Sequence, residues 1–83
     1  MKRSDEVIWR EVDGKVVGLD LGSSRYFSLN PSAVELWRLL ETEQSEPQLV
    51  AALVDSYGLD QAQAQGDVNA FLTVLRENGL LDE

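Results

Sequence analysis

The sequence contains no cysteine and no histidine. It therefore lacks the usual ligands of zinc, haem and iron–sulfur clusters, a thiol nucleophile and the commonest general base. Its acidic residues are scattered, and no nucleophile, phosphate-binding loop or metal-ligand spacing accompanies them. These absences argue against an enzyme, and we expect neither a metal nor another cofactor.

Basic residues are also scarce, since seven Lys and Arg stand against 15 Asp and Glu, a formal net charge of −8. Nucleic acids and anionic membranes attract Lys and Arg, so neither is an expected partner. No apolar run approaches the ~18 residues of a membrane span, and the first six residues are polar, unlike a signal peptide. We therefore expect a soluble, cytoplasmic protein.

A length of 83 residues predicts one domain that spans residues 1–83. A domain of this size buries only about 60–65% of its unfolded surface, and no disulfide adds to its stability. Such a protein should be modestly stable and should gain stability from a bound partner.

The first third of the chain is typical of three β-strands. Val7–Val12 and Val16–Leu21 are rich in β-branched and large apolar residues, and they flank Asp13-Gly14-Lys15. Asp-Gly between two such runs is a strong hairpin signal, because Gly accepts a positive φ. A second turn at Gly22-Ser23-Ser24 leads into Arg25–Leu29, which completes an antiparallel meander.

Side-chain alternation assigns the two faces of the third strand but not those of the first. In the third strand it places Phe27 and Leu29 on one face and Tyr26 and Ser28 on the other. The first strand alternates poorly, so either Ile8 or Trp9 could face the core.

Two helices follow the meander, because the apolar period changes to 3.6 residues. Asn30-Pro31 predicts an N-cap and a first helical residue for a helix over residues 31–41. The second helix begins after a Ser45–Gln48 capping box or with Pro47 as its first residue. Gly58 is its expected stop.

A third helix is expected from about Asp60 to Asn78-Gly79, with Gly66 either as a kink or as its true start. Leu80-Leu81 should then pack back on the core. The order β-β-β-α-α-α contains no βαβ unit, so we predict an α+β fold whose helices cover one face of an antiparallel sheet. The predicted helical core comprises Ala33, Leu36, Trp37, Leu40, Leu49, Val50, Leu53, Val54, Tyr57, Ala64, Val68, Phe71, Leu72 and Leu75.

The predicted third strand, Arg25–Leu29, lies at an edge of the sheet. An edge strand exposes unpaired N–H and C=O groups, which proteins commonly protect with Lys, Pro or a covering element. This strand has one charge, at its start, and no proline. It is either a short strand that only buries Phe27 and Leu29, or a docking edge for an extended peptide.

One flank of the third helix is small and apolar at its centre and polar at its ends. This flank could pack against one more element than the chain supplies, or it could simply meet the first helix or the sheet. Its residues are Gln63, Asp67, Ala70, Val74 and Asn78.

Three helices and a hairpin also suggest a DNA-binding winged helix-turn-helix. The third helix, however, has one base, Arg76, against three acids. A recognition helix needs Arg or Lys for phosphates and guanines. We therefore reject DNA binding, and a small assembly subunit that pairs through its edge strand remains as a further alternative.

Two motifs resemble the PqqD-like family of precursor-peptide recognition elements. The first is the Leu29-Asn30-Pro31 junction with Trp37 six residues after the proline. The second is the C-terminal series Asp67-Val68, Phe71-Leu72, Leu75 and Gly79-Leu80-Leu81. Each motif is degenerate by itself, but the order of both over Val7 to Leu81 is fairly specific.

The resemblance implies a winged helix-turn-helix that binds a peptide in place of DNA and is not an enzyme. The leader segment of a ribosomally made precursor would add as a strand beside the third strand, in the cleft next to the third helix. Apolar leader side chains would contact Phe27, Phe71 and Val74, and Asp67 would accept a hydrogen bond, attract a basic residue or only face solvent. Carried over by position, the peptide-binding residues are Arg25, Tyr26, Phe27, Ser28, Leu29, Asp67, Ala70, Phe71 and Val74.

The resemblance also implies partner enzymes, to which such proteins present the precursor. In lasso peptide biosynthesis these are a leader peptidase and a cyclase, whereas in pyrroloquinoline quinone formation the partner is a radical-SAM enzyme. The meander looks closer to the lasso-type members, through the run GKVVGLDLGSSRYFSLN.

Overall fold

A computed structural model describes the whole chain from Met1 to Glu83 and confirms the predicted order of three antiparallel strands and three helices. It adds a short strand at each end. The elements are β1 (Lys2–Arg3), β2 (Val7–Val12), β3 (Lys15–Asp20), β4 (Arg25–Leu29), α1 (Pro31–Leu39), α2 (Glu46–Tyr57), α3 (Gln61–Glu77) and β5 (Leu81–Asp82).

The main sheet has the order β2-β3-β4, and both pairings are antiparallel. Its first turn contains only Asp13 and Gly14, since Val12 pairs with Lys15. The two turn residues have φ of 53° and 76°, as a two-residue hairpin loop requires. The prediction that Lys15 belongs to the turn was therefore wrong by one residue.

Capping groups define the second helix as expected. The Ser45 hydroxyl accepts from the Gln48 N–H, and the Gln48 side chain accepts from the Ser45 N–H at 2.7 Å. The helix begins at Glu46, so Pro47 is its second residue, and Gly58 ends it in the left-handed conformation.

The other two helices differ slightly from their predicted bounds. The first ends at Leu39, two residues earlier than expected. In the third, Gly66 is an interior residue, so the alternative that it marks the helix start was wrong. None of the three helices has the length and apolar character that crossing a membrane requires.

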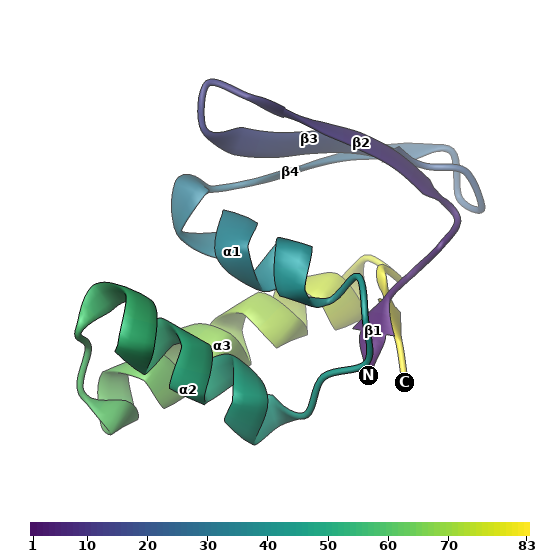
Figure 1. Ribbon diagram of the computed structural model, residues 1–83. Helices are drawn as coiled ribbons and strands as arrows, with labels where there is room; N and C mark the ends of the chain where they lie inside the picture. The colour runs from purple at the N-terminus through teal and green to yellow at the C-terminus, as the bar shows by residue number, and fades with distance from the viewer.

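The helices cover one face of the sheet, as predicted. Figure 1 shows the sheet above α1, with α2 and α3 on the far side of α1. Trp9, not Ile8, faces the helices, because its ring packs edge-on against the ring of Trp37 at 5.9 Å between centroids. The Ile8 side chain lies on the outer face and is 62% exposed.

The predicted core stripe of α3 is confirmed without exception. Its five apolar residues, Ala64, Val68, Phe71, Leu72 and Leu75, are all buried. Tyr57 was wrongly assigned to the core of α2, because its side chain is 55% exposed. It is the last residue of α2, beyond the buried residues Leu49, Val50 and Leu53.

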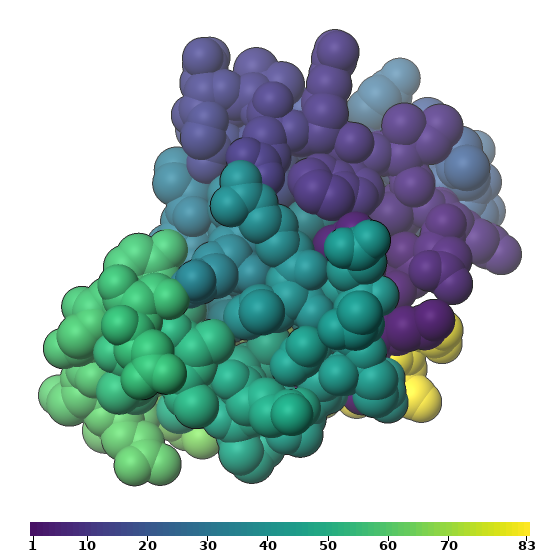
Figure 2. All heavy atoms as spheres, viewed as in Figure 1, coloured from purple at the N-terminus to yellow at the C-terminus, as the bar shows by residue number.

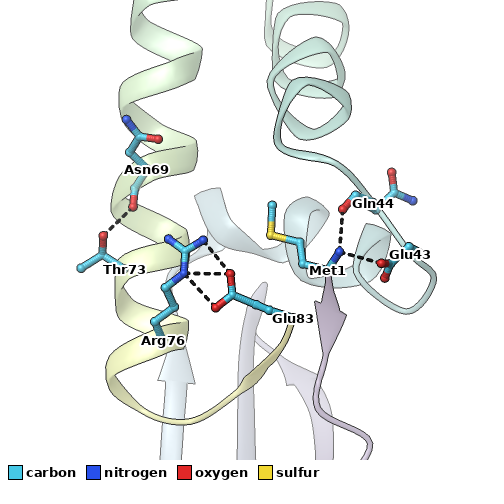
Figure 3. Close-up of polar contacts among 7 residues, drawn as sticks. All are labelled: Met1, Glu43, Gln44, Asn69, Thr73, Arg76 and Glu83. Carbon is cyan, nitrogen blue, oxygen red and sulfur yellow. Dashed lines mark hydrogen bonds and ion pairs between the residues drawn. The ribbon is translucent and has the colours of Figure 1, made fainter.

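The two ends of the chain pair with each other, which the sequence analysis did not predict. β1 and β5 form a two-stranded antiparallel ladder, and the two ends meet on the surface in Figure 2. The Met1 ammonium donates to the carbonyl of Gln44 at 3.1 Å and pairs with Glu43 at 2.9 Å (Figure 3). This terminal ladder therefore also holds the α1–α2 connection.

Arg3 joins the terminal ladder to the core. Its guanidinium donates to the carbonyl of Trp37 at 2.6 Å. The same group lies 4.9 Å from the ring centroid of Trp9 and 5.2 Å from that of Trp37. Desolvation by burial lowers the pKa of Arg3 below its usual value, against the opposing effect of Glu41.

Replacing Arg3 by Met should destabilise the protein, because it removes a charge-assisted hydrogen bond and a cation–π contact while the apolar stem is kept. We expect a loss of about 2 kcal/mol in the free energy of unfolding, measured by urea denaturation. Arg10→Met is the matched control, because Arg10 is exposed and makes no ion pair, and it should change stability by less than about 0.5 kcal/mol. Equal losses in the two variants would contradict the structural role of Arg3.

Candidate functional site

A cleft of about 670 Å³ lies between the end of β4 and the exposed flank of α3. Residues of α1, of the C-terminal half of α2 and of the α2–α3 connection complete its lining, so five parts of the chain enclose it. Most of the lining is apolar. The lining residues are Ser28, Leu29, Asn30, Ser32, Ala33, Leu36, Leu53, Tyr57, Leu59, Asp67, Ala70, Phe71 and Val74.

The outer edge of β4 borders this cleft and is free. In the order β2-β3-β4, β4 has one hydrogen-bonded neighbour, β3, and no strand on its other side. An edge strand of five residues presents unpaired backbone N–H and C=O groups along its length. The prediction that the third strand is an unprotected edge is therefore confirmed.

The sequence at the end of β4 positions the cleft. Only Asn30 separates β4 from α1, and Pro31 is the first residue of that helix. Leu29 is buried, and directly after it the chain turns into α1, which lies beneath the sheet (Figure 1). Leu36, a buried residue of α1, consequently forms part of the cleft lining.

The α3 flank singled out from the sequence is exposed over its whole length. Gln63, Asp67, Ala70, Val74 and Asn78 all face solvent, and the Val74 side chain is 43% exposed. The alternative that this flank meets the first helix or the sheet was therefore wrong. Three of the five residues line the cleft.

Asp67 is the one charged residue in the lining of the cleft. Its carboxylate makes no ion pair and no hydrogen bond within the chain. The cleft therefore combines an apolar surface, a free strand edge and a single negative charge.

The structure brings six of the nine predicted site residues together around the cleft. These are Ser28, Leu29, Asp67, Ala70, Phe71 and Val74. Arg25, Tyr26 and Phe27 belong to the same strand but lie outside the lining. They flank the cleft as the remaining length of the free edge.

Phe27 faces the helices and packs on the core instead of lining the cleft. Its ring lies 5.4 Å from that of Trp37, between centroids. The space for the ring exists because its partner on β3 is Gly18. A Cβ at residue 18 would lie only 2.5 Å from the Phe27 ring and 2.9 Å from the carbonyl oxygen of Ile8.

A second hollow, of about 650 Å³, lies on the outer face of the sheet. Cross-strand rows of side chains form it, such as Ile8, Leu19 and Tyr26, and the Tyr26 side chain is 85% exposed. This hollow has the sheet as its only wall. The cleft beside α3 has several walls and a free backbone edge, so we take the cleft as the candidate site.

The sequence did not indicate that the residues on the side of α1 and α2 line the cleft. They include Asn30, Ser32, Leu36, Tyr57 and Leu59. Leu36 and Tyr57 had been assigned only to the core. The incomplete burial of Tyr57 has no signal in the helical period, because it depends on where α3 lies.

Comparison with known proteins places the chain in a family. Residues 15–81 match the model of coenzyme PQQ synthesis protein D (PqqD). The chain belongs to the PqqD family. No curated protein matched this PqqD family member.

Two solved structures are similar to this PqqD family member. One is TbiB1 in complex with the TbiA(beta) leader peptide, with 33% identity and a TM-score of 0.86 over 99% of this chain and 95% of that one. The other is lasso peptide synthetase B1 complexed with the leader peptide. It has 28% identity and a TM-score of 0.78 over 95% of this chain and 93% of that one.

The Gly18–Phe27 contact predicts opposite effects for two Gly→Ala replacements. Gly18→Ala should force the Phe27 ring away from Trp37 and destabilise the protein by about 1–3 kcal/mol. Gly66→Ala is the matched control, because a Cβ there meets nothing within 4 Å, and a helix-interior Ala is more stable than Gly by about 0.5–1 kcal/mol. Urea denaturation of both variants checks the signs, and a neutral Gly18→Ala would contradict the proposed close packing.

Proposed function

We propose that this protein binds the leader segment of a ribosomally synthesised precursor peptide, as a non-catalytic recognition protein. The leader adds as a strand to the free edge of β4 and lies in the cleft beside α3. The peptide-binding residues are Arg25, Tyr26, Phe27, Ser28, Leu29, Asp67, Ala70, Phe71 and Val74. Arg25, Tyr26 and Phe27 contribute through the backbone edge of β4, and the others line the cleft.

The observation that carries this proposal is the coincidence of a free backbone edge with an adjacent apolar cleft. Strand addition needs both, since main-chain hydrogen bonds supply affinity and pockets for alternate side chains supply specificity. Membership of the PqqD family and the leader peptides bound to the two similar structures also support it. About ten ordered peptide residues fit an affinity of about −8 to −12 kcal/mol, which is micromolar to nanomolar.

The proposal extends to the enzymes that act on the precursor. The protein presents the leader to a leader peptidase and a cyclase of lasso peptide biosynthesis, which the similarity to lasso peptide synthetase B1 supports. Occupation of the cleft leaves the outer face of the sheet free, so a second protein can contact the loaded complex. The alternative is a PqqD-type role, in which the precursor is delivered to a radical-SAM enzyme.

Val74→Asp should weaken leader binding at least tenfold, because it places a charge where apolar leader side chains are buried. The binding partner is a synthetic leader peptide from the precursor gene nearest to the gene of this protein, and titration calorimetry measures the dissociation constant. Thr73→Asp is the matched control. Thr73 is exposed, adjoins Val74 and does not line the cleft, so this variant should bind within about twofold of wild type.

Circular dichroism should show both variants folded, because both positions are exposed. Equal affinities for wild type and Val74→Asp would contradict the assignment of the cleft. Self-association in sedimentation equilibrium, without any affinity for the peptide, would favour the assembly subunit instead.

N-methylation of single leader residues tests the strand ladder itself. In an antiparallel ladder alternate residues of the added strand direct their N–H groups toward β4. We expect methylation to weaken binding at alternate residues only, with the intervening residues tolerant. Uniform tolerance would indicate that side chains alone hold the peptide, and it would contradict strand addition.

Reconstitution tests the role in presentation. A purified leader peptidase of lasso peptide biosynthesis that cleaves this precursor should do so faster when wild-type protein is added. Val74→Asp should remove most of the stimulation and Thr73→Asp should keep it, because only the first impairs leader binding. Equal stimulation by both variants, measured by mass spectrometry of the cleaved leader, would argue against presentation through the cleft.

A further inference from the structure

The negative charge of Asp67 is electrostatically isolated within the cleft. The other lining residues are apolar or neutral polar. The chain carries a net charge of −8, so its long-range field does not compensate this carboxylate. Asp67 is exposed in this structure, and a peptide that covers it removes water from its carboxylate.

Four of the seven Lys and Arg side chains interact with groups other than Asp67. Arg38 forms a two-pronged pair with Glu11, with both N···O distances 2.6 Å. Arg76 pairs with Glu83, an interaction that lowers the pKa of the Glu83 carboxyl (Figure 3). Arg3 is held against the two indole rings and Lys2 pairs with Asp5.

The three remaining bases, Arg10, Lys15 and Arg25, form no ion pair with Asp67 either. Arg10 and Lys15 share the outer face of the sheet, because they pair across β2 and β3 with Val17 and Val12. Arg25 is at the start of β4, at the opposite end of the strand from the cleft-lining Ser28 and Leu29. No group of the protein is therefore paired with the Asp67 carboxylate in this structure.

We infer that Asp67 selects leader peptides that carry Lys or Arg at the position facing it. A carboxylate covered by an uncharged peptide loses its hydration without compensation, whereas a cation supplies a charge-assisted hydrogen bond. Backbone pairing along β4 accepts many sequences, so this one charge distinguishes between peptides that fit the apolar surface equally well. This inference rests on the proposed function.

The charge requirement can be tested by exchanging the two charges. The same synthetic leader is titrated into wild type, Asp67→Asn and Asp67→Lys, and each Lys or Arg of the peptide is replaced in turn by Glu. We expect Asp67→Asn to bind about tenfold more weakly and Asp67→Lys more weakly still. One Glu-substituted peptide should bind poorly to wild type and recover affinity for Asp67→Lys.

Two further measurements complete the test: the salt dependence of binding, and control variants of a second acidic residue on α3. Raising NaCl from about 50 mM to about 500 mM should weaken wild-type binding more than that of Asp67→Asn, because salt screens an ion pair. Glu77→Gln and Glu77→Lys are the controls, since Glu77 is an exposed acid of the same helix outside the cleft. These variants change the net charge equally and should bind within about twofold of wild type.

Several outcomes would overturn the inference while leaving the proposed function intact. One is tight binding of a leader without Lys or Arg in its paired segment, and another is wild-type affinity of Asp67→Asn. A third is a loss of affinity in Asp67→Asn that depends neither on salt nor on any basic residue of the peptide, which would make Asp67 an acceptor for a backbone N–H. Absence of leader binding by the wild-type protein would instead refute the proposed function, and the inference with it.

Discussion

The buried indole of Trp37 connects the parts of the fold that must be placed correctly for β4 to have a free edge. The indole ring contacts Trp9 of β2 and Phe27 of β4. The backbone carbonyl of Trp37 accepts a hydrogen bond from the guanidinium of Arg3. These contacts hold α1 beneath the sheet, to which a single residue, Asn30, connects it from β4. With α1 beneath the sheet and α3 beyond it, no segment of the chain reaches the outer side of β4.

A free strand edge next to an apolar cleft carries a risk of self-association, because two such edges can pair with each other. Two features oppose that outcome in this protein. The net charge of −8 makes copies of the chain repel one another. In addition, α3 stands beside the edge of β4, so the cleft accepts a single extended chain more readily than the edge of another sheet.

Local patterns predicted most of the fold, because each element has its own signal in the sequence. Asp13-Gly14 requires two positive φ angles, and the Ser45–Gln48 capping box is complete within four residues. The β1–β5 ladder has no such signal. Each of its strands has two residues, and its pairing depends on Arg3 reaching Trp37, 34 residues away in the sequence.

The site was predictable to a similar extent, and for the same reason. The edge position of β4 in the predicted meander and the periodicity of α3 indicated these two walls of the cleft. The contributions of Leu36 and Tyr57 depend on how three helices pack, which no single period encodes. In the proposed function, main-chain pairing along β4 accepts many sequences, so discrimination between peptides rests on the few side chains that line the cleft. In such a site the cost of covering an unpaired carboxylate depends on whether the peptide brings a cation, whereas the gain from an apolar contact depends only on the apolar area that is buried.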